Sequence, residues 1–76
     1  MERVRAHYVQ LEPGRMYRNR GGGTYRCIDC AGTAAARIQN TASGWTLLAH
    51  GMQMYPDGTI EWNYSTEGHF APLPAI

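Results

Sequence analysis

Residues 44–65, GWTLLAHGMQMYPDGTIEWNYS, constrain the fold more than any other part of the chain. At their centre, residues 56–58 (Pro-Asp-Gly) fit a type I turn followed by a left-handed glycine, which is the usual three-residue hairpin loop with a bulge. This loop pairs Tyr55 with Thr59 and sets the register of both flanking strands. The sequence therefore predicts a β-hairpin here.

The register can be followed outward from the turn, and it separates apolar from polar side chains. One face carries the pairs Met54–Ile60, Met52–Trp62 and His50–Tyr64, and the other carries Gln53–Glu61 and Gly51–Asn63. A slip by one residue would mix the two sets. We therefore expect Trp62 in the core, and His50 beside Tyr64 as a core histidine that is hydrogen-bonded to a neighbour.

The remaining chain also reads as β-structure, because glycine-rich turns separate short runs of aromatic and β-branched residues. Strands are expected near residues 15–20, 24–30, 34–40, 45–55 and 59–65. Five short strands in succession predict an all-β fold, a small five-stranded antiparallel meander of the SH3-like barrel type. A Pro-Gly turn at residues 13–14, ahead of a short strand, is frequent in such barrels.

The 76 residues form one domain, residues 1–76, with a modest core. Residues 1–10 are expected to form an N-terminal arm or an edge strand. Residues 71–76 are expected to be an irregular tail, because Pro72 and Pro74 lack the N–H that a sheet needs. In that tail Leu73 would act as an anchor, together with Phe70. A core of this size also favours a homo-oligomer.

The charge of the chain limits the classes of partner. The net charge is +1, which argues against a strongly electrostatic nucleic-acid binder. All seven basic residues are arginines, and they lie between Arg3 and Arg37. Arginine suits bidentate contact with phosphate or carboxylate, although a GC-rich genome also explains the use of arginine in place of lysine.

No apolar run has the length of a membrane span, and a signal peptide is not recognisable, so we expect a cytoplasmic protein with reduced thiols.

The segment RMYRNRGGGTYRC suggests a ligand site. If residues 21–23 form a three-residue loop, Arg20 faces Thr24 and Arg18 faces Arg26, so three arginines share the outward face. Two directly opposed arginines repel unless an anion or exposure relieves them, and consecutive glycine amides can form an anion nest. The candidate ligand-binding residues are Arg18, Arg20, Gly21, Gly22, Gly23, Tyr25, Arg26 and Trp45, with Tyr17, Tyr25 and Cys27 on the inward face. The alternatives are a solvated face around a mobile tip, and a Trp45 that closes the end of the barrel.

The motif CIDC, residues 27–30, would need His50 and His69 to complete a zinc site. Positions three apart in a strand point to opposite faces, so Cys27 and Cys30 are expected as buried or edge thiols, and the zinc site stays an open question. Neither a Ser/His/Asp spacing nor a pair of acids on one element emerges. We therefore expect no enzyme, no catalytic residue and no cofactor.

The segments GGGTYRC, SGWTLLAHG and YPDGTIEWNYSTEGHF resemble very small proteins encoded by phages and prophages of gut-type bacteria, over most of residues 11–70. Small phage proteins of this kind are often inhibitors of host defence. Together with the arginine cluster, the resemblance implies a non-enzymatic counter-defence protein in the bacterial cytoplasm that sequesters an anionic nucleotide signal. The alternatives are a docking module that inhibits a host protein, and an SH3-like domain that binds nucleic acid weakly.

Overall fold

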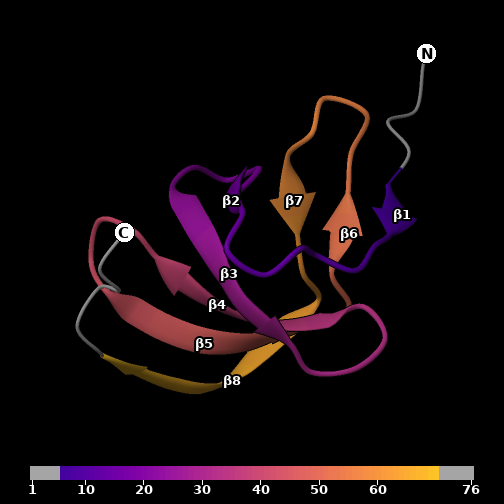
Figure 1. Cartoon of the computed structure of the whole chain (residues 1–76). Helices are drawn as coiled ribbons and strands as arrows, with labels where there is room; N and C mark the ends of the chain where they lie inside the picture. Colours follow the sequence, from indigo (N-terminus) through magenta and orange to yellow (C-terminus); the bar gives the residue numbers. More distant parts are fainter. Residues whose placement is uncertain (1–5, 71–76) are drawn as a thin grey trace.

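The computed structural model describes residues 6–70, which form eight β-strands in two antiparallel sheets (Figure 1). The strands are β1 (His7–Tyr8), β2 (Met16–Arg18), β3 (Thr24–Cys30), β4 (Ala35–Asn40), β5 (Trp45–His50), β6 (Gln53–Met54), β7 (Ile60–Glu61) and β8 (Tyr64–Phe70). The predicted all-β fold is confirmed. These residues contain no helix, and so none long and apolar enough to cross a membrane. The expected tail, residues 71–76 with Leu73, lies outside the described residues.

The larger sheet has the order β2-β3-β4-β5-β8, and the smaller sheet has the order β1-β6-β7. Strands β2 to β5 are neighbours in sequence, whereas β8 returns to the free side of β5. The long strands expected at 45–55 and 59–65 are each divided between the two sheets, and the second runs on to Phe70. Of the two alternatives for the N-terminus, His7 and Tyr8 form an edge strand against β6.

The hairpin around residues 56–58 has the predicted register. Met54 pairs with Ile60 and His50 with Tyr64, and the amide of Tyr55 donates to the carbonyl of Thr59 at 2.9 Å. The hairpin bends between these pairs, where Gly51 has a φ of 75°, so that β6 and β7 turn away from β5 and β8 (Figure 1).

This bend overturns one prediction. His50 and Tyr64 were expected on the core face, but Tyr64 is 59% exposed and His50 is half-buried. A flat hairpin keeps alternate residues on one face. The left-handed glycine breaks that alternation, so the apolar face of β6 and β7 does not continue into β5 and β8.

The core lies between the two sheets. The buried residues of the cluster are Leu11, Tyr17, Cys27, Ala36, Ile38, Leu47, Ala49, Met52 and Ile60, with Val9, Tyr25, Met54 and Trp62 packed against them. Trp62 thus joins the core as predicted, half-buried. We call the side of the large sheet that carries Cys27, Ile38 and Ala49 its inner face, and the opposite side its outer face.

The loop between β2 and β3 differs from its prediction. Arg18 pairs with Thr24, not with Arg26, and the amide of Asn19 donates to the carbonyl of Gly23 at 2.9 Å, so the three-residue loop is 20–22 and not 21–23. Asn19 organises it, since its side chain accepts from the Gly21 amide at 2.7 Å and its carbonyl accepts from the Gly22 amide at 2.9 Å. The resulting register avoids placing two arginines directly opposite each other, which would be repulsive.

Candidate functional site

A row of facing side chains crosses all five strands on the outer face of the large sheet. In order from β2 to β8 it consists of Met16, Arg26, Gln39, Thr46 and His69. Gln39 and Thr46 are each only 2% exposed, and Gln39 Nε2 donates to the carbonyl of Gly44 at 3.1 Å. The Thr46 hydroxyl is buried and has no hydrogen-bond partner among residues 6–70. Such unsatisfied groups are uncommon in native proteins.

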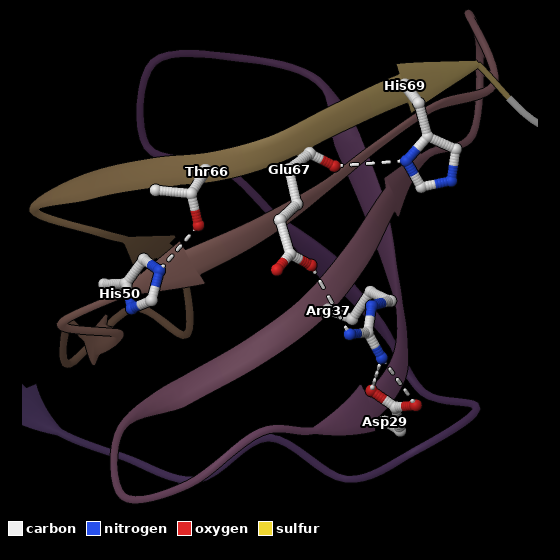
Figure 2. Close-up of polar contacts among 6 residues, drawn as sticks. All are labelled: Asp29, Arg37, His50, Thr66, Glu67 and His69. Carbon is white, nitrogen blue, oxygen red and sulfur yellow. Dashed lines mark hydrogen bonds and ion pairs between the residues drawn. The ribbon is translucent and has the colours of Figure 1, made fainter.

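The next row is centred on Arg37, whose charge is neutralised by two carboxylates (Figure 2). Arg37 Nη1 lies 3.1 Å from both oxygens of Asp29, and Nη2 lies 3.7 Å from Glu67 Oε1. Asp29 is the partner of Arg37 across β3 and β4, whereas Glu67 comes from β8. This part of the outer face is therefore an ion-pair network of one cation and two carboxylates, which leaves no positive charge for an anionic ligand.

A bulge in β8 brings Glu67 to this network. Thr46 pairs with His69 but Leu48 pairs with Thr66, so Glu67 and Gly68 together face a single residue of β5. Glu67 takes a left-handed conformation, with a φ of 53°, which is costly for a side-chain-bearing residue. The extra residue lets Glu67 follow Thr66 onto the outer face.

His50 lies in a third row of the outer face. Its ring stacks on Tyr64 with 4.5 Å between the centroids. Its Nε2 is 2.9 Å from the hydroxyl of Thr66, as Figure 2 shows. The predicted hydrogen bond to a neighbour is thus present, although the residue lies outside the core. His69 Nδ1 is 3.1 Å from the carbonyl oxygen of Glu67, so the two histidines belong to separate local networks.

Arg18 and Arg26 lie on the outer face at the β2–β3 end of the sheet. They are diagonal neighbours, because Arg18 pairs with Thr24 and Arg26 pairs with Met16. Neither has a carboxylate within 4.0 Å among the described residues. A guanidinium stays charged at any physiological pH, so this corner of the face carries two cations without a counter-charge.

Arg20 does not join them, so the prediction that three arginines share the outward face is wrong. Arg20 is a residue of the loop itself and lies against the β6–β7 hairpin, where its guanidinium is 4.0 Å above the Tyr55 ring and 3.9 Å from Asp57. Hydrogen bonds from the side chain and backbone of Thr59 lower the pKa of Asp57, and Arg20 lowers it further. Arg20 thus has a structural partner in the small sheet.

The predicted aromatic and glycine components also lie elsewhere. Tyr25 faces inward as expected and meets Trp62 edge-on at 5.2 Å. Trp45 is on the same inner side, where a Cβ on Gly68 would lie 2.6 Å from its ring, so the indole packs on β8. Neither ring shares a face with Arg18 and Arg26. The amides of Gly21 and Gly22 are used by Asn19, as described above, which leaves no nest of three free amides.

Cys27 and Cys30 do not meet the two histidines. Both cysteines pair with inner-face residues of β4, Ile38 and Ala36, whereas His50 and His69 lie on the outer face. No group of three or more potential metal ligands forms within the part of the chain that the structure describes. The expectation that the two cysteines point to opposite faces is wrong, because the strand shifts register between Cys27 and Asp29.

Comparisons of the chain with protein-family models, with curated proteins and with solved structures find no match.

The ion-pair network and the buried polar pair Gln39–Thr46 were not predicted from the sequence. One signal for them was present, since β4 alternates small or apolar Ala36 and Ile38 with Arg37 and Gln39. Period-two alternation places Arg37 and Gln39 together on one face of a sheet. Thr46 and Glu67 had no comparable signal, because Glu67 depends on a bulge that no local sequence pattern announces.

Proposed function

We propose that this protein is a non-enzymatic binding protein that holds an anionic, nucleotide-like ligand at Arg18 and Arg26. One observation carries the proposal. Of the five arginines within residues 6–70, three have a carboxylate partner: Arg15 has Glu12, Arg20 has Asp57 and Arg37 has Asp29. Arg18 and Arg26 alone have none in the described chain, and they share one corner of one face.

The chemistry of this corner fits a phosphate with an attached apolar group. Two guanidinium groups offer planar, bidentate donors to phosphate oxygens. Met16, directly opposite Arg26, is 46% exposed and offers the apolar contact for a base. Met16 thereby replaces Tyr25 and Trp45, which lie on the inner face, as the residue that contacts the base.

The proposal includes a counter-defence role in the bacterial cytoplasm, in keeping with the resemblance to small phage proteins. It also includes an SH3-like arrangement. In support, β2 to β5 are consecutive antiparallel strands, the bent hairpin contributes to both sheets, and a parallel bridge between Asn19 and Ile60 links β2 to the small sheet. Self-association is supported by β8, a seven-residue strand at the edge of the large sheet.

Isothermal titration with cyclic dinucleotides and ADP-ribose-type nucleotides tests the proposal. We expect binding to the natural protein, loss of at least tenfold in affinity for Arg18→Gln and Arg26→Gln separately, and no detectable heat for the double variant. Arg15→Gln is the matched control, because it removes the same charge from an exposed side chain that already has a carboxylate partner. Equal loss in the control, or no heat with any nucleotide, contradicts the proposal.

A protein partner with an acidic surface is the second candidate, favoured by the exposed apolar side chains Met16 and Ile28 near the two arginines. A pull-down from host lysate separates the candidates. A stoichiometric protein that is captured by the natural chain and lost with Arg26→Gln would replace the nucleotide in the proposal. Native mass spectrometry of the purified protein reports the number of subunits and any retained nucleotide in the same measurement.

A further inference from the structure

The two cysteines of CIDC lie on the same face of β3 because the strand contains a bulge. Cys27 pairs with Ile38, but Asp29 pairs with Arg37 and Cys30 with Ala36, so Ile28 is the extra residue. Ile38 and Ala36 are both buried in the core, at 0% and 1% exposure. A regular strand would send residues three apart to opposite faces, and the bulge cancels that alternation.

The positions of the two cysteines are compatible with a disulfide. Their partners are two residues apart in β4, which corresponds to a separation of about 6.6 Å along the strand. Disulfides span Cα separations of roughly 4.4–6.8 Å. Both thiols are free, and Cys30 Sγ donates to the carbonyl of Leu11 at 2.9 Å. Burial raises the pKa of Cys27, and the charge of Cys30, a hydrogen bond with Cys30 and the charge of Asp29 add to this rise, which brings the pKa to about 11.

The two thiols differ in accessibility, and this difference sets their order of reaction. Cys27 is fully buried, whereas Cys30 is half-buried at the end of β3. A soluble reagent reaches Cys30 first, since thiol–disulfide exchange requires access to the attacking sulfur. Cys27 can then react only with a mixed disulfide that has already formed on Cys30. Cys27 is therefore the resolving thiol.

We propose that Cys27 and Cys30 form a reversible intramolecular disulfide by exchange with a low-molecular-weight disulfide such as oxidised glutathione. The Cys30 thiolate attacks one glutathione sulfur, the glutathione S–S bond breaks, and one glutathione thiolate leaves and takes up a proton. The Cys27 thiol then attacks the Cys30 sulfur, the mixed S–S bond breaks, and the second glutathione leaves as a thiolate that takes up the proton of Cys27. Two protein thiols are oxidised by two electrons, and one glutathione disulfide is reduced to two thiols.

The test is a titration of the full chain with oxidised glutathione, followed by alkylation, trypsin digestion and mass spectrometry. Cleavage after Arg26 and Arg37 leaves both cysteines in one peptide, residues 27–37. We expect this peptide to lose two hydrogens, to carry no alkyl group, and to regain two alkylation sites after treatment with dithiothreitol. Reaction that stops at a mixed disulfide on Cys30, a disulfide between two chains, or no reaction overturns the proposal.

Two variants test the order of the steps. Cys27→Ala should accumulate glutathione on Cys30. In Cys30→Ala, Cys27 should stay unmodified at the concentration of oxidised glutathione that forms the disulfide in the natural protein. If Cys27→Ala fails to fold, Cys30→Ala alone still tests the order of the two steps. Modification of Cys27 in that variant, at the glutathione concentration used for the natural protein, contradicts the proposed order. Nucleotide titration of the oxidised protein is independent of this outcome, since Arg18 and Arg26 lie on the other face.

Discussion

At the scale of single residues, burial changes the chemistry of a side chain more than its type does. Cys27 and Cys30 are the same residue three positions apart, yet only Cys27 is enclosed by core residues. Enclosure disfavours the thiolate, because the low-dielectric interior solvates its charge poorly. Arginine shows the same dependence on surroundings, since Arg37 is bound by two acids while Arg18 and Arg26, on the same face, have none in the described chain.

The pKa of Cys27 predicts how stability changes at alkaline pH. Its ordinary value of 9.0 rises to about 11 in the folded protein. Below pH 9 the thiol is protonated in both the folded and the unfolded chain, and its full contribution to the free energy of unfolding is present. Between pH 9 and pH 11 the unfolded chain releases this proton while the folded chain keeps it, so the free energy of unfolding falls, by roughly 3 kcal/mol in total.

Urea unfolding of the natural protein and of Cys27→Ala, across pH 8 to 11.5, checks this prediction. Tyrosines ionise in the same pH range, so the ionisation of Cys27 is read from the difference in the free energy of unfolding between the two proteins. That difference should shrink as the pH rises. A difference that stays constant from pH 8 to 11.5 would show that Cys27 does not titrate as described.

At the scale of elements, the sequence predicts strands and turns well and predicts bends and bulges poorly. The register of the hairpin at residues 56–58 was predictable because its turn type follows from three residues and its two faces differ in polarity. The glycine loop had no such constraint: a three-residue loop at 20–22 and one at 21–23 both satisfy the pattern, and the hydrogen bonds of Asn19 decide between them. The face of each cysteine depended on a bulge at Ile28 that has no turn signature.

The bend at Gly51 predicts a position that rejects any side chain. Its φ is 75°, and a Cβ there would lie 2.7 Å from Asn63 Cγ. Gly51→Ala should lower the free energy of unfolding by roughly 2–4 kcal/mol, as strain of the left-handed backbone adds to the clash. Denaturant unfolding measures this loss.

Gly58→Ala is the matched control, since Gly58 also has a left-handed φ, 89°, but a Cβ would meet nothing within 4 Å. It should cost only the backbone strain, roughly 1–2 kcal/mol. Adding Asn63→Ala to Gly51→Ala should recover part of the difference between the two variants, because the Cβ of residue 63 stays at 3.0 Å and the hydrogen bond from Gln53 is lost. Equal losses for Gly51→Ala and Gly58→Ala would show that the contact with Asn63 does not matter.

At the scale of the whole molecule, the bent hairpin makes the two sheets one cooperative unit. Strands β5 and β6 are consecutive across Gly51, and β7 and β8 are consecutive across residues 62–63, so each arm of the hairpin belongs to both sheets. A small sheet of short strands is marginal in isolation. Here it closes one side of the core through Met52 and Ile60, which are both fully buried.

Ile60 connects the parts of this unit and provides the last prediction. Its side chain is 0% exposed, it pairs with Met54 within the small sheet, and its carbonyl accepts from the Arg20 amide at 2.9 Å, which ties β7 to the loop after β2. Ile60→Ala should lower the free energy of unfolding by roughly 2–5 kcal/mol, because it removes buried methyl groups and leaves a cavity between the sheets.

The mode of unfolding distinguishes one cooperative unit from two. Tryptophan fluorescence, which reports Trp62 in the small-sheet layer and Trp45 in the large sheet, should shift to lower urea together with far-ultraviolet circular dichroism. Thr59→Ala, which removes the hydroxyl that donates to Asp57 in the turn of the same hairpin, is the control; it should move both midpoints together, and by less than Ile60→Ala does. If Ile60→Ala separated the two transitions, the small sheet would be unfolding alone, and the hairpin would not couple the sheets as its continuous strands indicate.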